Sequence, residues 1–388
     1  MVYQSLQPLF SPKTVAIVGA SRDKNSIGYS IVHNLVNSEF TGLVYPVNPK
    51  ARAVHSIPCY PSLLEIPVDI DLAVVAVPRD NVLEVMKNAL AKKVKALVII
   101  TAGFREVGEE GRLLEEKILQ MARQGGIRMV GPNCMGIINT QPQISLNATF
   151  APIPARPGHV GFVSQSGALG VAILNVADKL GLGLTQFISM GNKADVSGND
   201  MLEYWEKASE TRVIAMYLES FGNPKKFVHL ARRIGKQKPI LVVKSGRTPE
   251  GARAASSHTG ALAAGDITIS ALLDSCGVVR VETIQELFDT ARVFVKWQKV
   301  EGKNVAILTN AGGPAIMATD SCVGLGLEIP ALSQNTRQRL STFLPKEASL
   351  RNPVDMIAAA GEKEYAQALQ TLLEEPEIHM VLVIFVHP

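Results

Sequence analysis

Thr14-Val-Ala-Ile-Val-Gly-Ala20 is a short run that is apolar on both faces and ends in glycine and alanine. Two runs of the same character follow, Leu72 to Pro78 and Ala96 to Thr101. Continuous apolar runs of this length are typical of strands that are covered on both sides, as in a parallel sheet. Helical patterns separate the runs, at 81–93 and 109–124. This strand–helix–strand alternation predicts right-handed crossovers and a doubly wound α/β fold.

The same alternation restarts twice further along the chain. Apolar runs at 159–164, 184–190, 213–219 and 239–244 indicate a second α/β block, and a third begins at Asn304. A proline-containing connector precedes the second block and a Glu-Gly turn precedes the third. The predicted domains span residues 1–145, 146–299 and 300–388, which agrees with a prior of about 150 residues per domain.

The third block ends on Met380-Val-Leu-Val-Ile-Phe-Val-His-Pro388, a strongly apolar strand that no helical pattern follows. A strand of this kind needs a covering layer on each face. We therefore expect the third domain to be incomplete. Either the sequence is part of a longer polypeptide, or a partner chain completes the layer.

The composition excludes several classes of protein. Of 388 residues, 47% are hydrophobic and 19% charged, which is too apolar for an intrinsically disordered chain. The net charge of +4 is spread along the chain, so we expect no binding of nucleic acid or anionic membranes. No apolar run reaches the roughly 18 residues of a membrane span, and the N-terminus lacks a signal-peptide pattern. The 4 cysteines are widely spaced, which favours a cytoplasmic protein without disulfides or a metal site.

A glycine-rich turn follows the first strand. Gly19-Ala20-Ser21 ends the strand, and Ser26-Ile27-Gly28 opens a helix whose N-terminus suits a phosphate. Lys50 and Val77-Pro78 end the next two strands, at the same edge of the predicted sheet. The GxGxxG spacing is absent, and Lys50 stands where an acidic residue for NAD is expected, which favours a ligand with more phosphate. A tight structural turn beside a surface lysine explains the same residues without a ligand.

The second block contains a similar turn. Ser164-Gln165-Ser166-Gly167 lies between a strand and a helix and suits an anion, although serine as an N-cap needs no ligand. It departs from the GxSxG elbow of hydrolases, so a hydrolase triad is disfavoured. Gly191-Asn192-Lys193 ends the next strand and is expected in the same pocket. Glu219 ends the strand after that, where it is either a solvated loop residue or the partner of an imidazole.

His258 lies among small residues, between Ser256-Ser257 and Thr259-Gly260. This composition indicates an exposed, adaptable loop. A neutral histidine can attack phosphorus at pH 7 and later give the phosphoryl group away. The surrounding hydroxyl and N–H groups would hold the phosphate oxygens. A surface loop with an incidental histidine is the alternative interpretation.

Together these motifs resemble the CoA-binding and ligase domains of the ADP-forming acyl-CoA synthetases, relatives of the succinyl-CoA synthetase α subunit. The resemblance covers essentially the whole chain. In order, the matching segments are Ser11 to Ser21, Val47 to Lys50, Tyr60 to Leu63, Val77-Pro78, Gly103-Phe104 with Glu109 to Gly111 nearby, Gly131 to Cys134, Ser164 to Gly167, Gly191-Asn192, Ser257 to Leu262, Asn310 to Pro314 and Asn352 to Asp355. So many motifs in one order are far more specific than any single one.

The resemblance implies an N-terminal Rossmann-like CoA-binding domain followed by two flavodoxin-like ligase domains, the last one incomplete. The implied CoA-binding residues are Gly19, Ala20, Ser21, Arg22, Ser26, Ile27, Lys50, Val77 and Pro78. The implied phosphate and substrate contacts are Ser164, Gln165, Ser166, Gly167, Gly191 and Asn192. His258 would carry the phosphoryl group, and Glu219 would orient its imidazole as a triad carboxylate does.

The implied reaction converts a carboxylic acid, CoA and ATP to acyl-CoA, ADP and phosphate, reversibly, through an acyl phosphate and phosphorylated His258. The family binds ATP or ADP and Mg²⁺ on an ATP-grasp domain, and no stretch of this sequence reads as one. We therefore expect that domain beyond residue 388 or on a partner subunit, in an oligomeric enzyme.

Two other interpretations remain open. In the first, the chain is the CoA-binding regulatory region of a protein lysine acetyltransferase, a class in which the loop histidine is often lost. The presence of His258 and Glu219 favours the synthetase. In the second, the chain binds CoA and carries out no chemistry.

Overall fold

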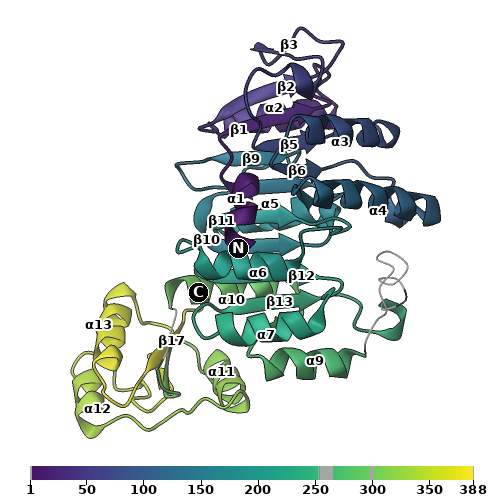
Figure 1. Cartoon of the computed structure of the whole chain (residues 1–388). Helices are drawn as coiled ribbons and strands as arrows, with labels where there is room; N and C mark the ends of the chain where they lie inside the picture. The colour runs from purple at the N-terminus through teal and green to yellow at the C-terminus, as the bar shows by residue number, and fades with distance from the viewer. Residues whose placement is uncertain (1, 252, 254–264, 298–300, 388) are drawn as a thin grey trace. The chain divides into compact units, whose positions relative to one another are not determined.

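A computed structural model describes residues 2–251, 253, 265–297 and 301–387 (Figure 1). The chain forms two compact units, Met1–Gln298 (unit 1) and Lys299–Pro388 (unit 2). Strands alternate with helices in both units, and the main sheets are wholly or largely parallel. The α/β class predicted from the apolar runs is confirmed. The division into three domains stays a proposal.

Unit 1 contains two large sheets, and the first has the strand order β2–β1–β5–β6–β7, with every pair parallel. Its strands are β1 (Thr14–Val18), β2 (Leu43–Val47), β5 (Leu72–Val75), β6 (Ala96–Ile99) and β7 (Arg128–Val130). Val15 and Ile17 pack into one core cluster and Ala16 and Val18 into another, so β1 is covered on both faces. This double burial explains why β1 is apolar from Val15 to Val18.

The helices of this half of unit 1 are α1 (Val2–Phe10), α2 (Ile27–Asn37), α3 (Val82–Ala91) and α4 (Glu109–Gln124). Short elements lie between them: β3 (Ala53–Val54), β4 (Ile57–Pro58), η1 (Leu63–Glu65), η2 (Arg79–Asn81) and η3 (Arg105–Val107).

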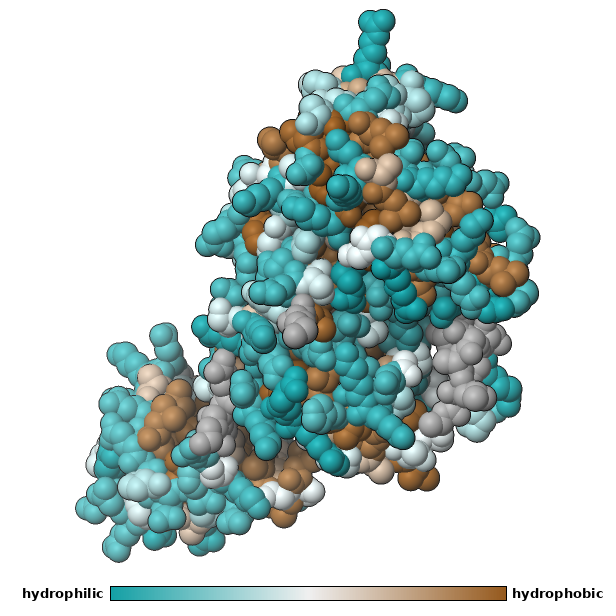
Figure 2. Space-filling model, in the orientation of Figure 1, coloured by the Kyte–Doolittle hydropathy of each residue, from teal (hydrophilic) through white to brown (hydrophobic). Residues whose placement is uncertain are grey.

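On the face of the chain shown in Figure 2, hydrophilic side chains predominate and apolar side chains form smaller patches between them.

The second sheet has the order β14–β13–β12–β10–β11–β8–β9. Its parallel strands are β10 (Pro157–Ser164), β11 (Leu184–Ser189), β12 (Val213–Leu218), β13 (Ile240–Lys244) and β14 (Val279–Val281). Its described helices are α5 (Gly167–Lys179), α6 (Gly198–Lys207), α7 (Pro224–Ile234), α9 (Asp266–Ser275) and α10 (Ile284–Lys296). The chain builds β11 on one side of β10 and then crosses to β12 on the other. Ligands of such sheets bind at this reversal, outside the carboxyl ends of the strands.

An antiparallel hairpin, β8 (Gly136–Asn139) and β9 (Leu146–Thr149), extends the second sheet along β11. A domain boundary near residue 145 would divide this hairpin. Measured by sheet membership, the chain passes from the first sheet to the second between Val130 and Gly136. The sequence pattern did not reveal this, because Gln141-Pro142, in the turn of the hairpin, has the polar, proline-containing character of a connector between domains.

Arg128 on β7 joins elements of both halves of unit 1. Its Nε lies 2.8 Å from Asp195 Oδ2, one terminal nitrogen lies 3.3 Å from Asp200 Oδ1, and the other donates to Ser5 Oγ at 2.9 Å. Burial lowers the pKa of Arg128, but the two carboxylates outweigh this and raise it above its ordinary value. The guanidinium thus stays charged while it ties α1 and α6 to the first sheet.

Unit 2 has a parallel sheet in the order β16–β15–β17. Its elements are β15 (Val305–Thr309), α11 (Gly312–Gly324), α12 (Gln334–Ser341), β16 (Val354–Asp355), α13 (Glu362–Leu373) and β17 (Met380–Ile384). β15 is fully buried, whereas Leu382, Val383, Phe385 and Val386 are exposed. Within the described ranges of both units, no helix combines the length and apolar character needed to cross a bilayer.

Gly28 provides a test of how the first turn is packed. A Cβ at this position would lie 1.9 Å from the carbonyl oxygen of Gly19. We predict that Gly28→Ala lowers the free energy of unfolding by about 1–3 kcal/mol, because α2 must move away from the end of β1. Chemical denaturation measures the loss. Gly324→Ala is the control, since its methyl group would meet nothing within 4 Å. Equal effects of the two substitutions would contradict the close approach.

Candidate functional site

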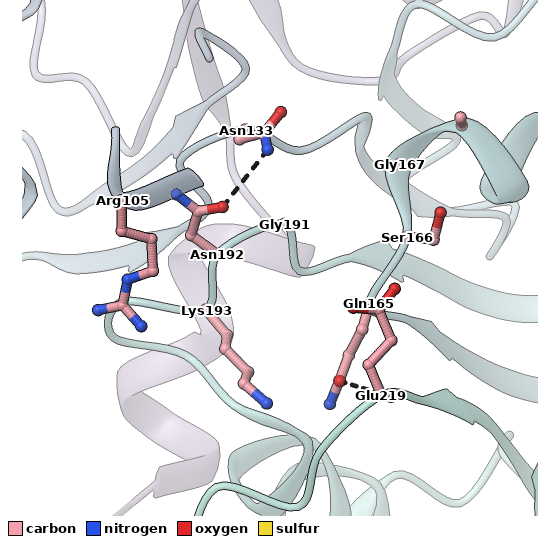
Figure 3. A pocket seen from close by; sticks show the side chains of 10 residues that line it. Arg105, Asn133, Gln165, Ser166, Gly167, Gly191, Asn192, Lys193 and Glu219 are labelled. Atoms are coloured by element: carbon pink, nitrogen blue, oxygen red, sulfur yellow. Dashed lines mark hydrogen bonds between the residues drawn. The ribbon is translucent and has the colours of Figure 1, made fainter. Parts of the chain in front are cut away.

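A cavity of about 210 Å³ lies where β10, β11 and β12 end (Figure 3). Its walls are Arg105, Asn133, Gln165, Ser166, Gly167, Ala168, Gly191, Asn192, Lys193 and Glu219. The volume is below the roughly 300–1,000 Å³ of sites for drug-sized ligands, which suits a small ligand. The position is the strand-order reversal of the second sheet, where the fold places ligands.

The N-terminus of α5 forms one wall of the cavity. Ser166 is its N-cap, and the Ser166 side chain accepts a hydrogen bond from the backbone N–H of Leu169. Gly167 and Ala168, in the first turn, also line the cavity. Backbone N–H groups and the positive end of the helix dipole favour an anion here. Ser164 is fully buried beneath the turn, where its hydroxyl donates to the carbonyl of Ser166 at 2.7 Å.

Gln165 fixes the loop that carries Glu219. Its Oε1 accepts from the backbone N–H groups of Glu219 at 2.8 Å and Ser220 at 2.9 Å, and its Nε2 donates to the Ser220 carbonyl at 2.7 Å. Gln165 is only 6% exposed, so these three bonds satisfy an otherwise costly buried amide. Glu219 is thereby held at the cavity wall through its backbone (Figure 3).

Lys193 brings a positive charge to the cavity. Its Nζ donates to the carbonyl of Ser220 at 3.0 Å and to the Ser220 hydroxyl. Burial lowers the pKa of Lys193 to about 8; Glu219 opposes this shift, and the cations Arg105 and Lys244 add to it. The ammonium group is therefore charged at neutral pH and loses its proton in mildly alkaline solution.

The loop after β11 packs tightly against a segment that follows β7. Gly191 has φ +54°, and a Cβ there would lie 2.2 Å from the carbonyl oxygen of Pro132. The backbone N–H of Asn192 donates to that same carbonyl at 2.9 Å. Only glycine allows this approach and this backbone conformation together, which accounts for glycine at position 191.

The side chain of Asn192 joins the two halves of unit 1 at the cavity. Its Nδ2 donates to Glu106 Oε2 at 2.6 Å and to Glu115 Oε2 at 2.7 Å, and its Oδ1 accepts from Asn133 at 3.4 Å. Arg105 Nε lies 2.5 Å from Glu115 Oε1. Glu115 is 1% exposed, so the carboxylate is buried but charge-paired.

The two carboxyl groups that accept hydrogen bonds from Asn192 have pKa values shifted in opposite directions. Burial raises the pKa of Glu115, and the bonds from Asn192 and Arg105 offset this only in part. Burial also acts on Glu106, but the Asn192 amide and the backbone N–H of Gly103 outweigh it and lower the pKa of Glu106. Glu106 is thus ionised at neutral pH and accepts from Asn192 as a carboxylate.

The predicted CoA turn is assembled at the carboxyl edge of the first sheet. Gly19 has φ +95° and its Cβ position lies 2.4 Å from the carbonyl oxygen of Ala76, so β1 and β5 approach closely there. Asn48 Nδ2 donates to the carbonyl of Ala20 at 2.7 Å. The Val77 carbonyl, before Pro78, accepts from Thr101 Oγ1 at 2.7 Å.

The second part of the predicted CoA turn leads into the N-terminus of α2. Ser26 is the N-cap of α2 and accepts from the backbone N–H of Tyr29 at 3.1 Å. Arg22, Ile27 and Lys50 are exposed, and the backbone N–H of Lys50 donates to Asn48 Oδ1 at 2.8 Å. Ser21 is partly exposed, and its hydroxyl accepts from the N–H of Asp23 at 3.0 Å.

The structure gathers most of the residues predicted for phosphate and substrate. Five of them line the cavity with Glu219: Gln165, Ser166, Gly167, Gly191 and Asn192. Ser164 supports the turn from below instead of lining the cavity. His258 lies outside the described residues. Among the described residues, no group of three or more His, Cys, Asp or Glu side chains is placed to hold a metal ion.

Lys193 lines the cavity, where its motif Gly191-Asn192-Lys193 is expected from the sequence, although it is not among the contacts that the resemblance implies. Three further residues of the wall were not predicted, Arg105, Asn133 and Ala168. Asn133 stands inside the Gly131-to-Cys134 motif, and Ala168 follows Gly167 directly. Arg105 follows Gly103-Phe104, but nothing in the sequence indicated that η3 would reach the second sheet.

Three family models match the chain in succession: "CoA binding domain" at residues 13–140, "Succinyl-CoA ligase like flavodoxin domain" at 157–294 and "Ligase-CoA domain" at 305–388. The chain is 40% identical to ADP-forming acetate–CoA ligase I of Archaeoglobus fulgidus over 98% of its own length and 54% of that protein. It is also 40% identical to the α subunit of ADP-forming acetate–CoA ligase II of Pyrococcus furiosus, covering 99% of this chain and 83% of the subunit.

Among solved structures, the chain is similar to acetyl-coenzyme A synthetase 1 of Candidatus Korarchaeum cryptofilum in complex with phosphate and ADP. The TM-score is 0.94 at 36% identity, over 99% of this chain and 82% of that one. The chain thus spans about half of one relative and most of the other two. With the three successive family models and this identity along its whole length, the chain belongs to the family of ADP-forming acyl-CoA synthetases.

Proposed function

We propose that this chain is the CoA-binding and phosphoryl-transfer part of an enzyme that converts a carboxylic acid, CoA and ATP to acyl-CoA, ADP and phosphate, reversibly. The observation that carries the proposal is the cavity at the ends of β10, β11 and β12. It combines a helix N-terminus, a lysine and a carboxylate, as a site for an acyl phosphate and a histidine would require.

In the direction of ATP formation, inorganic phosphate attacks the thioester carbonyl of acyl-CoA, and the thiolate of CoA leaves. The acyl phosphate formed lies with its phosphate at the N-terminus of α5 and beside Lys193. The imidazole of His258 then attacks phosphorus, and the carboxylate leaves. Glu219 orients the imidazole and stabilises its positive charge. Most of the catalysis comes from positioning and charge neutralisation.

CoA binds at the edge of the first sheet. The turn from Gly19 to Ile27 and the nearby Val77-Pro78 surround its nucleotide half, and Lys50 neutralises phosphate charge. The acid is a short carboxylic acid, in agreement with the small cavity and with relatives named for acetate. ADP or ATP with Mg²⁺ binds on an ATP-grasp domain outside these residues or on a partner subunit, within an oligomer located in the cytoplasm.

The acetyltransferase alternative is not favoured. The two relatives described above, which match nearly the whole chain, are named as CoA ligases. The chain also retains a histidine in the Ser257-to-Leu262 motif and a carboxylate at position 219.

The first prediction from this proposal concerns His258. Incubation of the chain with acyl-CoA and radioactive phosphate is expected to label the protein, and His258→Ala should abolish the label while CoA binding stays nearly unchanged. His229→Ala, on the exposed face of α7, is the matched control and should label normally. A label that persists in His258→Ala would remove His258 from the reaction.

A second prediction concerns Glu219. Glu219→Gln should slow phosphorylation by about tenfold to a hundredfold, because a poorly oriented imidazole is a weak nucleophile. Thermal melting should stay unchanged, since Gln165 holds position 219 through its backbone N–H. Glu210→Gln at an exposed position is the control. Wild-type kinetics in Glu219→Gln would place this carboxylate outside the mechanism.

A third prediction follows from the lowered pKa of Lys193, about 8. Below that pH the ammonium attracts phosphate, and above it the neutral amine does not. Phosphate affinity, measured by calorimetry, should therefore fall about tenfold from roughly pH 7.5 to 9.5. Lys193→Met should bind weakly and with little pH dependence over this range. A pH-independent affinity in the wild-type chain would show that Lys193 does not contact the anion.

A further inference from the structure

Lys193 has the placement of a nucleophile as well as that of a counter-ion. It lines the cavity at the end of β11, and its side chain runs toward Glu219 and Gln165 (Figure 3). The two hydrogen bonds from Nζ to the carbonyl and hydroxyl oxygens of Ser220 account for both N–H groups of a neutral amine. The lone pair of that neutral amine is then left for attack on an electrophile.

The charged groups around Lys193 come from three elements. Glu219 follows β12 and favours the ammonium form, whereas Arg105 on η3 and Lys244 at the end of β13 disfavour it. Burial disfavours it further, so the neutral amine is a sizeable fraction near pH 8. An ordinary exposed lysine, with a pKa of about 10.4, is almost wholly protonated there.

We propose that Lys193 is a modification site that is acylated by a short acyl phosphate held in this cavity. The inference rests on the proposed function for the source of the acyl phosphate inside the enzyme. Nζ attacks the acyl carbonyl carbon and a C–N bond forms. The C–O bond to phosphate breaks, phosphate leaves with its electron pair, and the proton lost from nitrogen passes to phosphate or water. The products are an amide and inorganic phosphate.

Acylation has a direct consequence for the cavity. The amide carries no charge, so the anion site loses the positive charge of Lys193 while the N-terminus of α5 stays in place. An enzyme that accumulates acyl phosphate, because the phosphoryl group is not passed on, would thereby lower its own affinity for phosphate. The modification thus inhibits phosphate binding to an extent that increases with the concentration of acyl phosphate.

The test uses the full chain and acetyl phosphate added directly, so it does not depend on turnover. After a timed incubation at about pH 8, peptide mass spectrometry should find Lys193 acetylated roughly tenfold faster than the exposed lysines Lys225 and Lys236. The rate of acetylation at Lys193 should level off above about pH 8, the pKa of this lysine. Inorganic phosphate should slow the reaction at Lys193 alone.

Three arms of this experiment can overturn the proposal. Unfolding the chain in guanidinium must remove the preference for Lys193, since the preference comes from the folded cavity. Acetyl-CoA in place of acetyl phosphate must give little modification at Lys193. Equal rates at Lys193 and the exposed lysines in the folded chain, or modification from acetyl-CoA only, would refute acylation by acyl phosphate. A failure of the proposed function would show instead as absent phosphorylation of His258 with Lys193 acetylation intact.

Discussion

The cavity depends on one amide group, the side chain of Asn192. Its nitrogen donates to carboxyl groups of Glu106 and Glu115, which belong to η3 and α4 beside the first sheet, while its backbone belongs to the loop after β11 in the second. Loss of this amide would remove one donor from each of the two carboxyl groups, and a hydrogen bond to a charged group is worth about 1.5–3 kcal/mol. The same contact brings Arg105 to the cavity, because Arg105 pairs with Glu115. The amide and the Arg105–Glu115 pair thus hold together a site built from elements of both sheets.

The cavity contains one source of positive potential that does not depend on pH and one that does. The N-terminus of α5 supplies a positive potential that no change of pH removes. Lys193 supplies a charge that depends on pH, because burial brings its pKa to about 8. Glu219 supplies the negative charge, and Gln165 fixes its backbone. An acyl phosphate would thus meet a cation, a helix end and a carboxylate within one small volume, the combination that the proposed transfer to His258 needs.

Much of this architecture could be predicted from the sequence, because it follows local rules. Apolar runs such as 14–18 predicted buried parallel strands, and the Ser166-Gly167 turn predicted a helix N-terminus at the edge of the sheet. The contribution of Arg105 could not be predicted, because it depends on the packing of η3 against the second sheet. The hairpin at 136–149 was not predicted for a related reason. Its antiparallel pairing with β11 is a long-range contact that no local sequence pattern indicates. The role of His258, outside the described residues, stays a prediction.

The central claim is that the ends of β10, β11 and β12 form the anion site of a phosphoryl-transfer enzyme. Arsenate is a close analogue of phosphate, and its anomalous X-ray scattering locates it in a crystal without reference to any mechanism. In crystals of the full chain grown with arsenate, the account predicts an anomalous peak between Gly167 and Lys193, within hydrogen-bond distance of the first N–H groups of α5. An empty cavity in such crystals, with arsenate bound elsewhere on the chain, would contradict it.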